Sequence, residues 1–172
     1  MTNENETIDE NEMTNNLNIP TLDNVKVEFL RKNGYNNILE WLDDENNVYI
    51  GRRIRIGVKR DTYKGQKSND KYTIYDKDKS KPLILVIIKK SIWHNPFNNK
   101  IMLKYGRDKG IEFYKKYLLN DGTLINELDE KEYDKLPKTN LLNKLNELNE
   151  KNLGCWCAPS FCHGHIIQSL FR

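Results

Sequence analysis

All three cysteines of the chain and two of its three histidines lie within residues 155–165, CWCAPSFCHGH. Thiolate and imidazole are the ligands that Zn²⁺ prefers, and four of them close a tetrahedral site. Cys155 and Cys157 are two positions apart, so on a strand they share one face. Cys162 and His163 follow after a turn-forming stretch. The spacing therefore favours a metal site, with zinc as the candidate ion and these four side chains as candidate ligands.

The same window also fits covalent catalysis. Cys162 and His163 come directly before an expected terminal helix, where backbone N–H groups lower the pKa of a thiol and attract anions. Cys157 or Cys162 would then be the nucleophile and His163 the base. A third interpretation is a buried turn, because free cysteine is among the most buried residue types. The residues alone leave all three interpretations open.

Two further loops carry candidate ligand-binding residues. Gly51 ends an expected strand and permits close approach of a ligand to the backbone, while the guanidinium of Arg52 suits bidentate phosphate contact. Trp93 and Asn95 lie in SIWHNPF (91–97) and offer an aromatic face and an amide, the groups that stack on and read a base. A turn with a solvated arginine, and a packed tryptophan, are the simpler interpretations of the two loops.

Basic residues alternate with apolar ones along residues 52–60, RRIRIGVKR. Their cations are placed to follow a phosphate backbone along one strand. An exposed edge strand protected by charge gives the same pattern.

The net charge of +3 hides an uneven distribution along the chain. Residues 1–23 contain six acidic residues and neither Lys nor Arg, so the rest of the chain must carry +9 to give the total of +3. A basic body suits partners that carry phosphate, such as a nucleotide or a nucleic acid. A lysine-rich solvated surface would give the same balance.

The composition of the chain also indicates where in the cell the protein is located. No apolar run approaches the ~20 residues that cross a bilayer, and the acidic N-terminus lacks the features of a signal peptide. Three cysteines, an odd number, argue against a disulfide framework. We therefore expect no membrane association and a cytoplasmic protein, in the host cytoplasm if the protein is viral.

The hydrophobic pattern predicts strands that alternate with helices. Strands are expected at 25–30, 48–51, 52–60, 82–90 and 152–157, and helices within 36–47, from about residue 107, after Pro137 with Thr139 as N-cap, and at the C-terminus from Gly164. The uninterrupted apolar run in 82–90 is typical of a strand buried on both faces. If the strands at 48–51, 82–90 and 152–157 are parallel neighbours, the loops that follow them meet in one cleft.

This alternation predicts an α/β fold with a mixed or mostly parallel sheet. At 172 residues the chain is long enough for one domain. We expect a single small domain over residues 24–172, preceded by a disordered acidic tail over residues 1–22.

Three motifs together resemble the domain of unknown function family DUF4326, found in bacteria, phages and large DNA viruses. They are NNVYIGRR (46–53), SIWHNPF (91–97) and KNLGCWCAPSFCHGH (151–165), in the order and spacing of the family. The resemblance implies that the three loops form one signature, but it implies no reaction. Two positions depart from the family pattern. His94 replaces a usually small residue, and His165 replaces a usual Asp, which would cap the terminal helix better.

The sequence thus predicts an intracellular α/β domain whose Cys/His site binds a metal or a phosphate-bearing, nucleotide-related ligand. In an enzymatic version, Arg52 and Asn95 position the substrate beside Cys157, Cys162 and His163. The alternative is a zinc-stabilised module that binds nucleic acid or another partner without catalysis.

Overall fold

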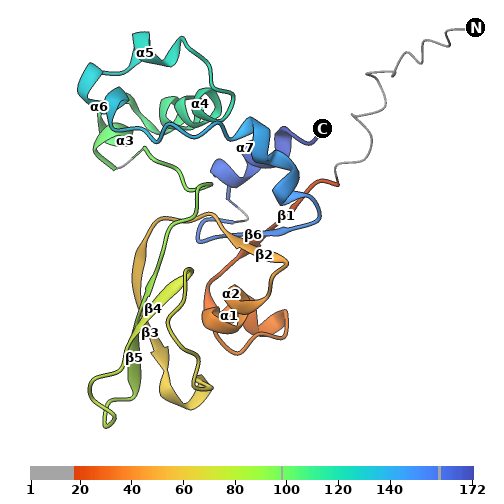
Figure 1. Cartoon of the computed structure of the whole chain (residues 1–172), viewed down its shortest axis with the longest axis vertical. Helices are drawn as coiled ribbons and strands as arrows, with labels where there is room; N and C mark the ends of the chain where they lie inside the picture. Colours follow the sequence, from red (N-terminus) through yellow and green to blue (C-terminus); the bar gives the residue numbers. More distant parts are fainter. Residues whose placement is uncertain (1–17, 98, 159) are drawn as a thin grey trace, which may run out of the picture.

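A computed structural model of the chain describes residues 18–97, 99–158 and 160–172. Within these ranges strands and helices form one small α/β domain (Figure 1), which confirms the predicted fold class. Most of the predicted disordered tail, residues 1–17, lies outside the described residues. Thr21 and Leu22 also belong to that predicted tail, but they lie in the first strand.

The central strand of the parallel sheet is the one that leads into the cysteine motif. The sheet has the order β1-β6-β2 and consists of β1 (Thr21–Asn24), β6 (Asn152–Cys155) and β2 (Asn47–Tyr49). Because β6 is parallel to both neighbours, the carboxyl ends of all three strands lie at one edge. The chain that follows β6 therefore starts beside the chain that follows β2.

The second sheet is antiparallel, with the order β3-β5-β4. Its strands are β3 (Ile54–Lys59), β5 (Leu83–Ile88) and β4 (Tyr72–Tyr75). The prediction that residues 82–90 are buried on both faces is wrong, as is their predicted parallel pairing with the strands of the first sheet. Ile84 and Ile88 are buried, whereas Leu83 is 53% exposed. An unbroken apolar run cannot reveal this alternation, because both faces carry the same residue type.

The strand predicted at residues 25–30 is also wrong. The side chain of Asn24 accepts a 2.9 Å hydrogen bond from the backbone N–H of Lys26, a local turn that ends β1 and lets a helix begin. The α-helices are α1 (Val27–Lys32), α2 (Ile38–Asp43), α3 (Asn99–Tyr105), α4 (Arg107–Leu118), α5 (Leu124–Glu127), α6 (Glu130–Asp134) and α7 (His163–Ser169).

Most of the other predicted helices are present in the structure. Helices α2, α4 and α7 occupy the segments in which the pattern placed helices. The leucine stripe after Pro137 forms a 3₁₀ helix, η3 (Leu142–Leu148), and Leu141 takes the N-cap position predicted for Thr139. A second 3₁₀ helix, η2 (Arg60–Thr62), follows β3.

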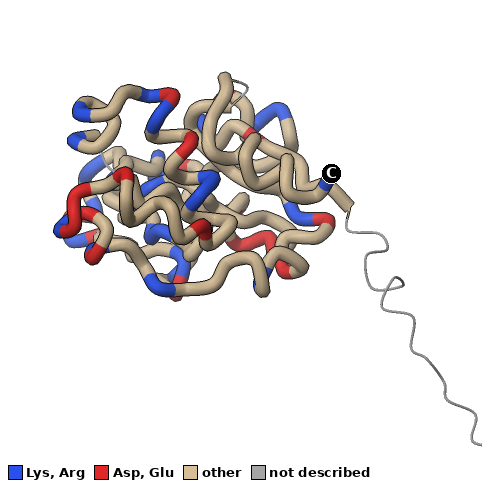
Figure 2. Tube along the Cα trace, turned by 90° about the horizontal axis from the view of Figure 1, so that it is seen from above, with Lys and Arg blue, Asp and Glu red and all other residues tan. Residues whose placement is uncertain are grey.

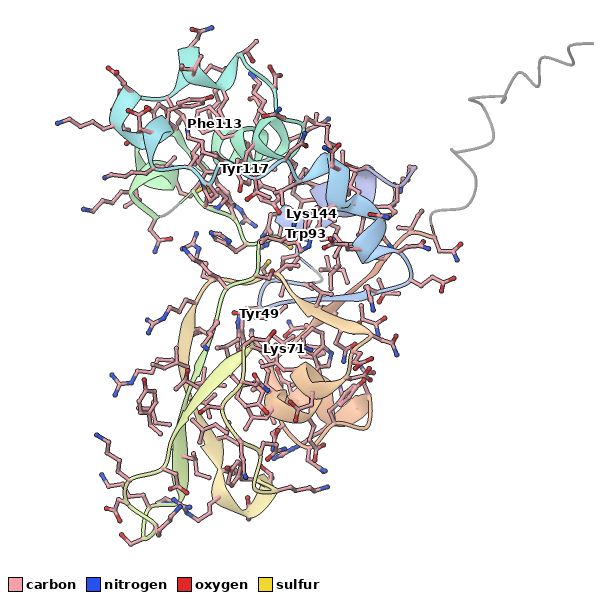
Figure 3. The ribbon with its side chains drawn as sticks, viewed as in Figure 1. Tyr49, Lys71, Trp93, Phe113, Tyr117 and Lys144 are labelled. Carbon is pink, nitrogen blue, oxygen red and sulfur yellow. The ribbon has the colours of Figure 1, made fainter. Side chains whose placement is uncertain are left out.

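Two apolar cores lie on opposite faces of the parallel sheet. Leu153 faces the upper core, which includes Phe113 of α4 and Ile167 of α7. Gly154 faces the lower core, where an added Cβ would lie 2.2 Å from the ring of Trp41 on α2. The lower core also contains the inner face of the antiparallel sheet. Figure 3 shows Phe113 among the upper helices and Tyr49 near the junction with the lower sheet.

The outer surface is mixed in charge. Lys and Arg are spread around the fold together with Asp and Glu (Figure 2), so the basic excess does not form one continuous face. Over the described ranges, no helix has both the length and the apolar character to cross a membrane.

Candidate metal centre

Three loops meet at the carboxyl edge of the parallel sheet. The backbone N–H of Ile50 donates to the carbonyl of Gly154 at 3.0 Å, which continues the β2–β6 pairing beyond the strand. The loop after β5 is held to the same edge by Ser91, whose hydroxyl donates to the carbonyl of Tyr49 at 2.7 Å. The convergence predicted from the sequence thus occurs, although β5 belongs to the other sheet.

A cavity of about 390 Å³ opens where these loops meet. Its walls come from residues of all three loops and the start of β3: Tyr49, Gly51, Arg52, Arg53, Ile54, Asn95, Cys155, Trp156, Cys157 and His163. Six of the predicted site residues therefore share one cavity: Gly51, Arg52, Asn95, Cys155, Cys157 and His163.

Cys155 and Cys157 line this cavity, and Cys162 lies close to them outside its wall. Cys155 and Cys157 point to the same side, with their sulfur atoms 2.9 Å apart, as their spacing predicts. Cys162 is the N-cap residue of α7 and returns towards them. The sulfur atoms of Cys155 and Cys162 and a ring nitrogen of His163 all lie within 4.8 Å of one another. Three soft donors from two elements thus converge on one point.

His163 is oriented by the neighbouring strand end. Its Nε2 lies 2.7 Å from the carbonyl oxygen of Ile50. Since a carbonyl only accepts hydrogen bonds, Nε2 carries the proton and Nδ1 keeps its lone pair. Burial lowers the pKa of His163 below its usual value, which favours the neutral ring. A neutral imidazole whose other N–H donates to a backbone carbonyl is the usual arrangement of a metal-binding histidine.

The three thiols perturb one another. Hydrogen bonds from Cys155 and Cys157 hold the pKa of Cys162 well below its usual range. Hydrogen bonds with Cys157 and Cys162, together with burial, raise the pKa of Cys155. A hydrogen bond with Cys155 lowers the pKa of Cys157, but its contact with Cys162 and burial outweigh this and raise that pKa to about 11. The contacts among the three thiols therefore favour the thiolate form of Cys162 over that of Cys155.

The position of Cys162 bears on its proposed role as a nucleophile. Its side chain is 6% exposed and is not part of the cavity wall, whereas Cys155, Cys157 and His163 are. The thiol with the lowest pKa is thus the one that lies farthest from the cavity space. This arrangement suits a ligand that closes a buried site better than a group that must reach a substrate.

The predicted ligand-binding residues have different surroundings. Arg52 donates from Nη1 to the side-chain oxygen of Asn99 at 2.6 Å, which ties it to the start of α3. Asn95 lines the cavity, and its side-chain oxygen accepts from the N–H of Phe97 at 2.9 Å. Gly51 lies against Tyr49, because a Cβ there would meet the phenol oxygen at 2.4 Å. Its lack of a side chain therefore serves packing.

Trp93 does not lie in the cavity wall. Its side chain is 2% exposed in the upper core, and its carbonyl accepts a 2.7 Å hydrogen bond from the hydroxyl of Tyr114 (Figure 3). A ring without an exposed face is not available to a base, so the burial of Trp93 favours the packing interpretation over stacking. A tryptophan that directly follows a core strand is more simply explained by packing.

Three cavity residues, Tyr49, Ile54 and Trp156, were not singled out by the sequence argument. Trp156 donates from Nε1 to the hydroxyl of Tyr49 at 2.7 Å, and that hydroxyl donates to the carbonyl of Arg52 at 2.7 Å. Trp156 lies between Cys155 and Cys157, so on a strand it must face away from both. This alternation was the available signal that an aromatic side chain borders the site.

The two unusual histidines also have defined partners. Nδ1 of His165 accepts a hydrogen bond from the backbone N–H of Cys162 at 3.0 Å, the reciprocal bond of a capping box. The expectation that His165 caps α7 poorly is therefore wrong. His94 is buried and its Nδ1 lies 2.7 Å from the carbonyl of Ser91, within the same loop.

Comparison with known proteins identifies a family. The family model described as domain of unknown function DUF4326 matches residues 35–172, which include all three loops and both sheets except β1. No curated protein and no solved structure matches the chain. The resemblance inferred from the three motifs is confirmed, and the chain belongs to the DUF4326 family.

Proposed function

We propose that the protein binds one zinc ion through Cys155, Cys162 and His163, with Cys157 as the fourth ligand. The observation that supports this proposal most strongly is the convergence of three donor atoms within 4.8 Å of one another. Thiolate and neutral imidazole are the preferred ligands of Zn²⁺. The carbonyl of Ile50 supports His163 from behind, as the outer partners of zinc-bound histidines do.

Zinc binding requires only a small movement of Cys157. With Zn–S bonds of about 2.3 Å, tetrahedral geometry separates two sulfur atoms by roughly 3.8 Å. The sulfur atoms of Cys155 and Cys157 are 2.9 Å apart. Cys157 is half-buried, lies beyond the end of β6 and is not among the three donors within 4.8 Å of one another, so its sulfur atom must move away from that of Cys155 by about 1 Å to complete the site. The ion then joins the end of β6 to the beginning of α7.

We further propose that the cavity above the ion accepts a phosphate-bearing, nucleotide-related ligand. Its volume of about 390 Å³ lies within the range of small-molecule sites. The cavity wall contains Arg52 and Arg53 and no Asp or Glu, so its charge favours an anion. The amide of Asn95 adds a polar group of the kind that orients such a ligand.

The metal part of this proposal is tested by zinc affinity in competition with a chromophoric chelator. Cys155→Ser, Cys162→Ser and His163→Asn each remove one ligand, and each should weaken zinc binding by about 100-fold or more. His165→Asn is the matched control, because an Asn oxygen at this position can still accept from the N–H of Cys162. Its zinc affinity should stay within about threefold of the original protein.

Equal affinity in all four variants would show that zinc binds elsewhere or only adventitiously. Circular dichroism is used to check whether each variant is folded. If a cysteine variant does not fold, His163→Asn and its control still decide the question, because both changes lie on the same short helix.

The phosphate part is tested with pyrophosphate as the probe, by calorimetric titration of the zinc-loaded protein. Arg52→Gln should weaken pyrophosphate binding by about tenfold while zinc affinity is unchanged. If Arg52→Gln binds pyrophosphate as the original protein does, the cavity is not the phosphate site, and the zinc proposal is unaffected.

A further inference from the structure

A second hollow, here called the β3 groove, lies beside the metal cavity. It has a volume of about 420 Å³, and its lining residues come from β3, from α1 and α2, and from the chain beside them. Its lining is mainly apolar: Val25, Val27, Leu30, Ile38, Ile56, Val58 and Leu83, with Trp156 at one side. Val27 and Leu83 are 48% and 53% exposed, so apolar surface here faces solvent.

The groove and the metal cavity are neighbours along the same strand. Trp156 lines both of them. Arg53 and Ile54 line the cavity, whereas the following residues 56–59 line the groove. The two hollows therefore lie end to end along β3, with the indole of Trp156 as their shared wall.

The rim of the β3 groove is basic. Lys26, Arg31 and Lys59 line it and are exposed, and no Asp or Glu is among its lining residues. Among the described residues, none of these three cations has an ion-pair partner, although cations elsewhere in the chain do, such as Arg60 with Asp76. Unpaired cations around an apolar floor suit a ligand that is both anionic and partly apolar.

The positions of the cations match an extended ligand. At about 3.3 Å per residue, β3 separates Arg53 from Lys59 by about 20 Å. A nucleic-acid strand rises about 3.4 Å per nucleotide when its bases are stacked and more when it is extended, so it would present at most roughly six phosphates over that length. Its unpaired bases could lie on the apolar floor and against Trp156, as in proteins that bind single strands with cations and aromatic side chains. A duplex keeps its bases stacked inside and offers no such apolar contact.

We propose that the β3 groove and the metal cavity form one channel for single-stranded nucleic acid. Phosphates lie along Lys26, Arg31, Arg53 and Lys59, and bases contact the apolar floor of the groove. The inference rests on the proposed function at one point, because it identifies the phosphate-bearing ligand of the cavity as the end of such a strand.

The test measures fluorescence anisotropy of a labelled oligothymidylate of about 15 nucleotides with the whole zinc-loaded chain. The double variant Lys26→Glu, Lys59→Glu should bind at least about tenfold more weakly. Four phosphate contacts predict that log K falls with log salt with a slope of about −2.8, and the double variant should show about half that slope.

The matched control is the double variant Lys115→Glu, Lys144→Glu, which changes the net charge equally. Lys115 lies on α4 and Lys144, labelled in Figure 3, lies on η3; both are exposed, and neither lines the groove. This control should bind the oligonucleotide within about threefold of the original protein. An equal loss in both double variants would show that binding follows net charge alone, which would overturn the proposal.

Two unlabelled competitors test whether the β3 groove prefers another kind of ligand. A duplex of the same length, or an extended acidic peptide of similar charge, should displace the labelled strand at least about tenfold less well than unlabelled oligothymidylate. If the peptide displaces it better, the groove is a peptide site and the proposal is wrong.

The zinc content is measured on the same samples by native mass spectrometry. Protein that holds zinc but does not bind the oligonucleotide contradicts only this inference. Protein that binds the oligonucleotide through the groove but takes up no zinc contradicts only the metal proposal.

Discussion

At the scale of single residues, Tyr49 connects the metal centre to the lower core. Its ring occupies the place that a side chain at Gly51 would need, and its hydroxyl accepts from Trp156 while donating to the carbonyl of Arg52. Burial raises the pKa of Tyr49 to about 12, so the hydroxyl keeps its proton and remains a donor across the neutral range. The hydroxyl of Tyr49 thus connects two residues of the cavity wall, Trp156 and Arg52.

Tyr49→Phe should lower the free energy of unfolding by about 0.5–1.5 kcal/mol, because the partly buried N–H of Trp156 loses its acceptor. Urea denaturation measures this change. Tyr75→Phe is the control, since Tyr75 is 43% exposed and its hydroxyl has access to water; its effect should be within about 0.5 kcal/mol. Equal effects of the two substitutions would contradict the structural role of the Tyr49 hydroxyl.

At the scale of elements, β6 is the part that positions the site. Its side chains alternate, so Leu153 and Cys155 face the upper core while Gly154 and Trp156 face the lower one. Because β6 is paired on both sides, its end is held firmly where the cysteines begin. The site therefore depends on the close packing of β6 against α2.

Gly154→Ala should destabilise the protein by about 1–3 kcal/mol through overpacking, because the new Cβ would lie 2.2 Å from the ring of Trp41 and 2.6 Å from Val25. Gly122→Ala is the matched control, since nothing lies within 4 Å of its Cβ position. The control should be neutral or slightly stabilising. Thermal unfolding compares the two, and a stable Gly154→Ala protein would contradict this packing of β6.

The sequence predicted those features of the site that follow from local spacing. Cys155 and Cys157 share a face because they are two residues apart on extended chain, and the end of β2 was found from its apolar run and its glycine. For Trp93 the sequence offered packing as the simpler interpretation beside stacking, but it could not decide between the two. Whether an aromatic ring after a strand packs inward depends on α4, which supplies Tyr114 from 21 residues further along the chain.

The errors in the fold have equally physical causes. Residues 25–30 alternate like a strand, but a hydrogen bond from Lys26 to the Asn24 side chain turns the chain into α1. The apolar run of β5 fits either sheet type, because alternation is invisible where every residue is apolar. Both outcomes were set by contacts that the pattern of residue types does not encode.

At the scale of the whole molecule, the metal centre lies where the two cores and the two sheets meet. Cys155 and Cys162 are part of the upper core, and Trp156 and Tyr49 belong to the lower one. The proposed zinc ion at this junction would join the central strand to the C-terminal helix. The β3 groove extends from the same junction along the antiparallel sheet.

The central claim is that the Cys/His cluster is a zinc site, and native mass spectrometry of the whole chain tests it most directly. The account predicts one zinc ion per chain after incubation with one equivalent of zinc, and a much smaller zinc-bound fraction in His163→Asn when a competing chelator is present in both samples. The ion should also protect the cysteines of the folded protein from alkylation. A chain that stays metal-free under these conditions, with its thiols equally reactive with and without zinc, would contradict the account.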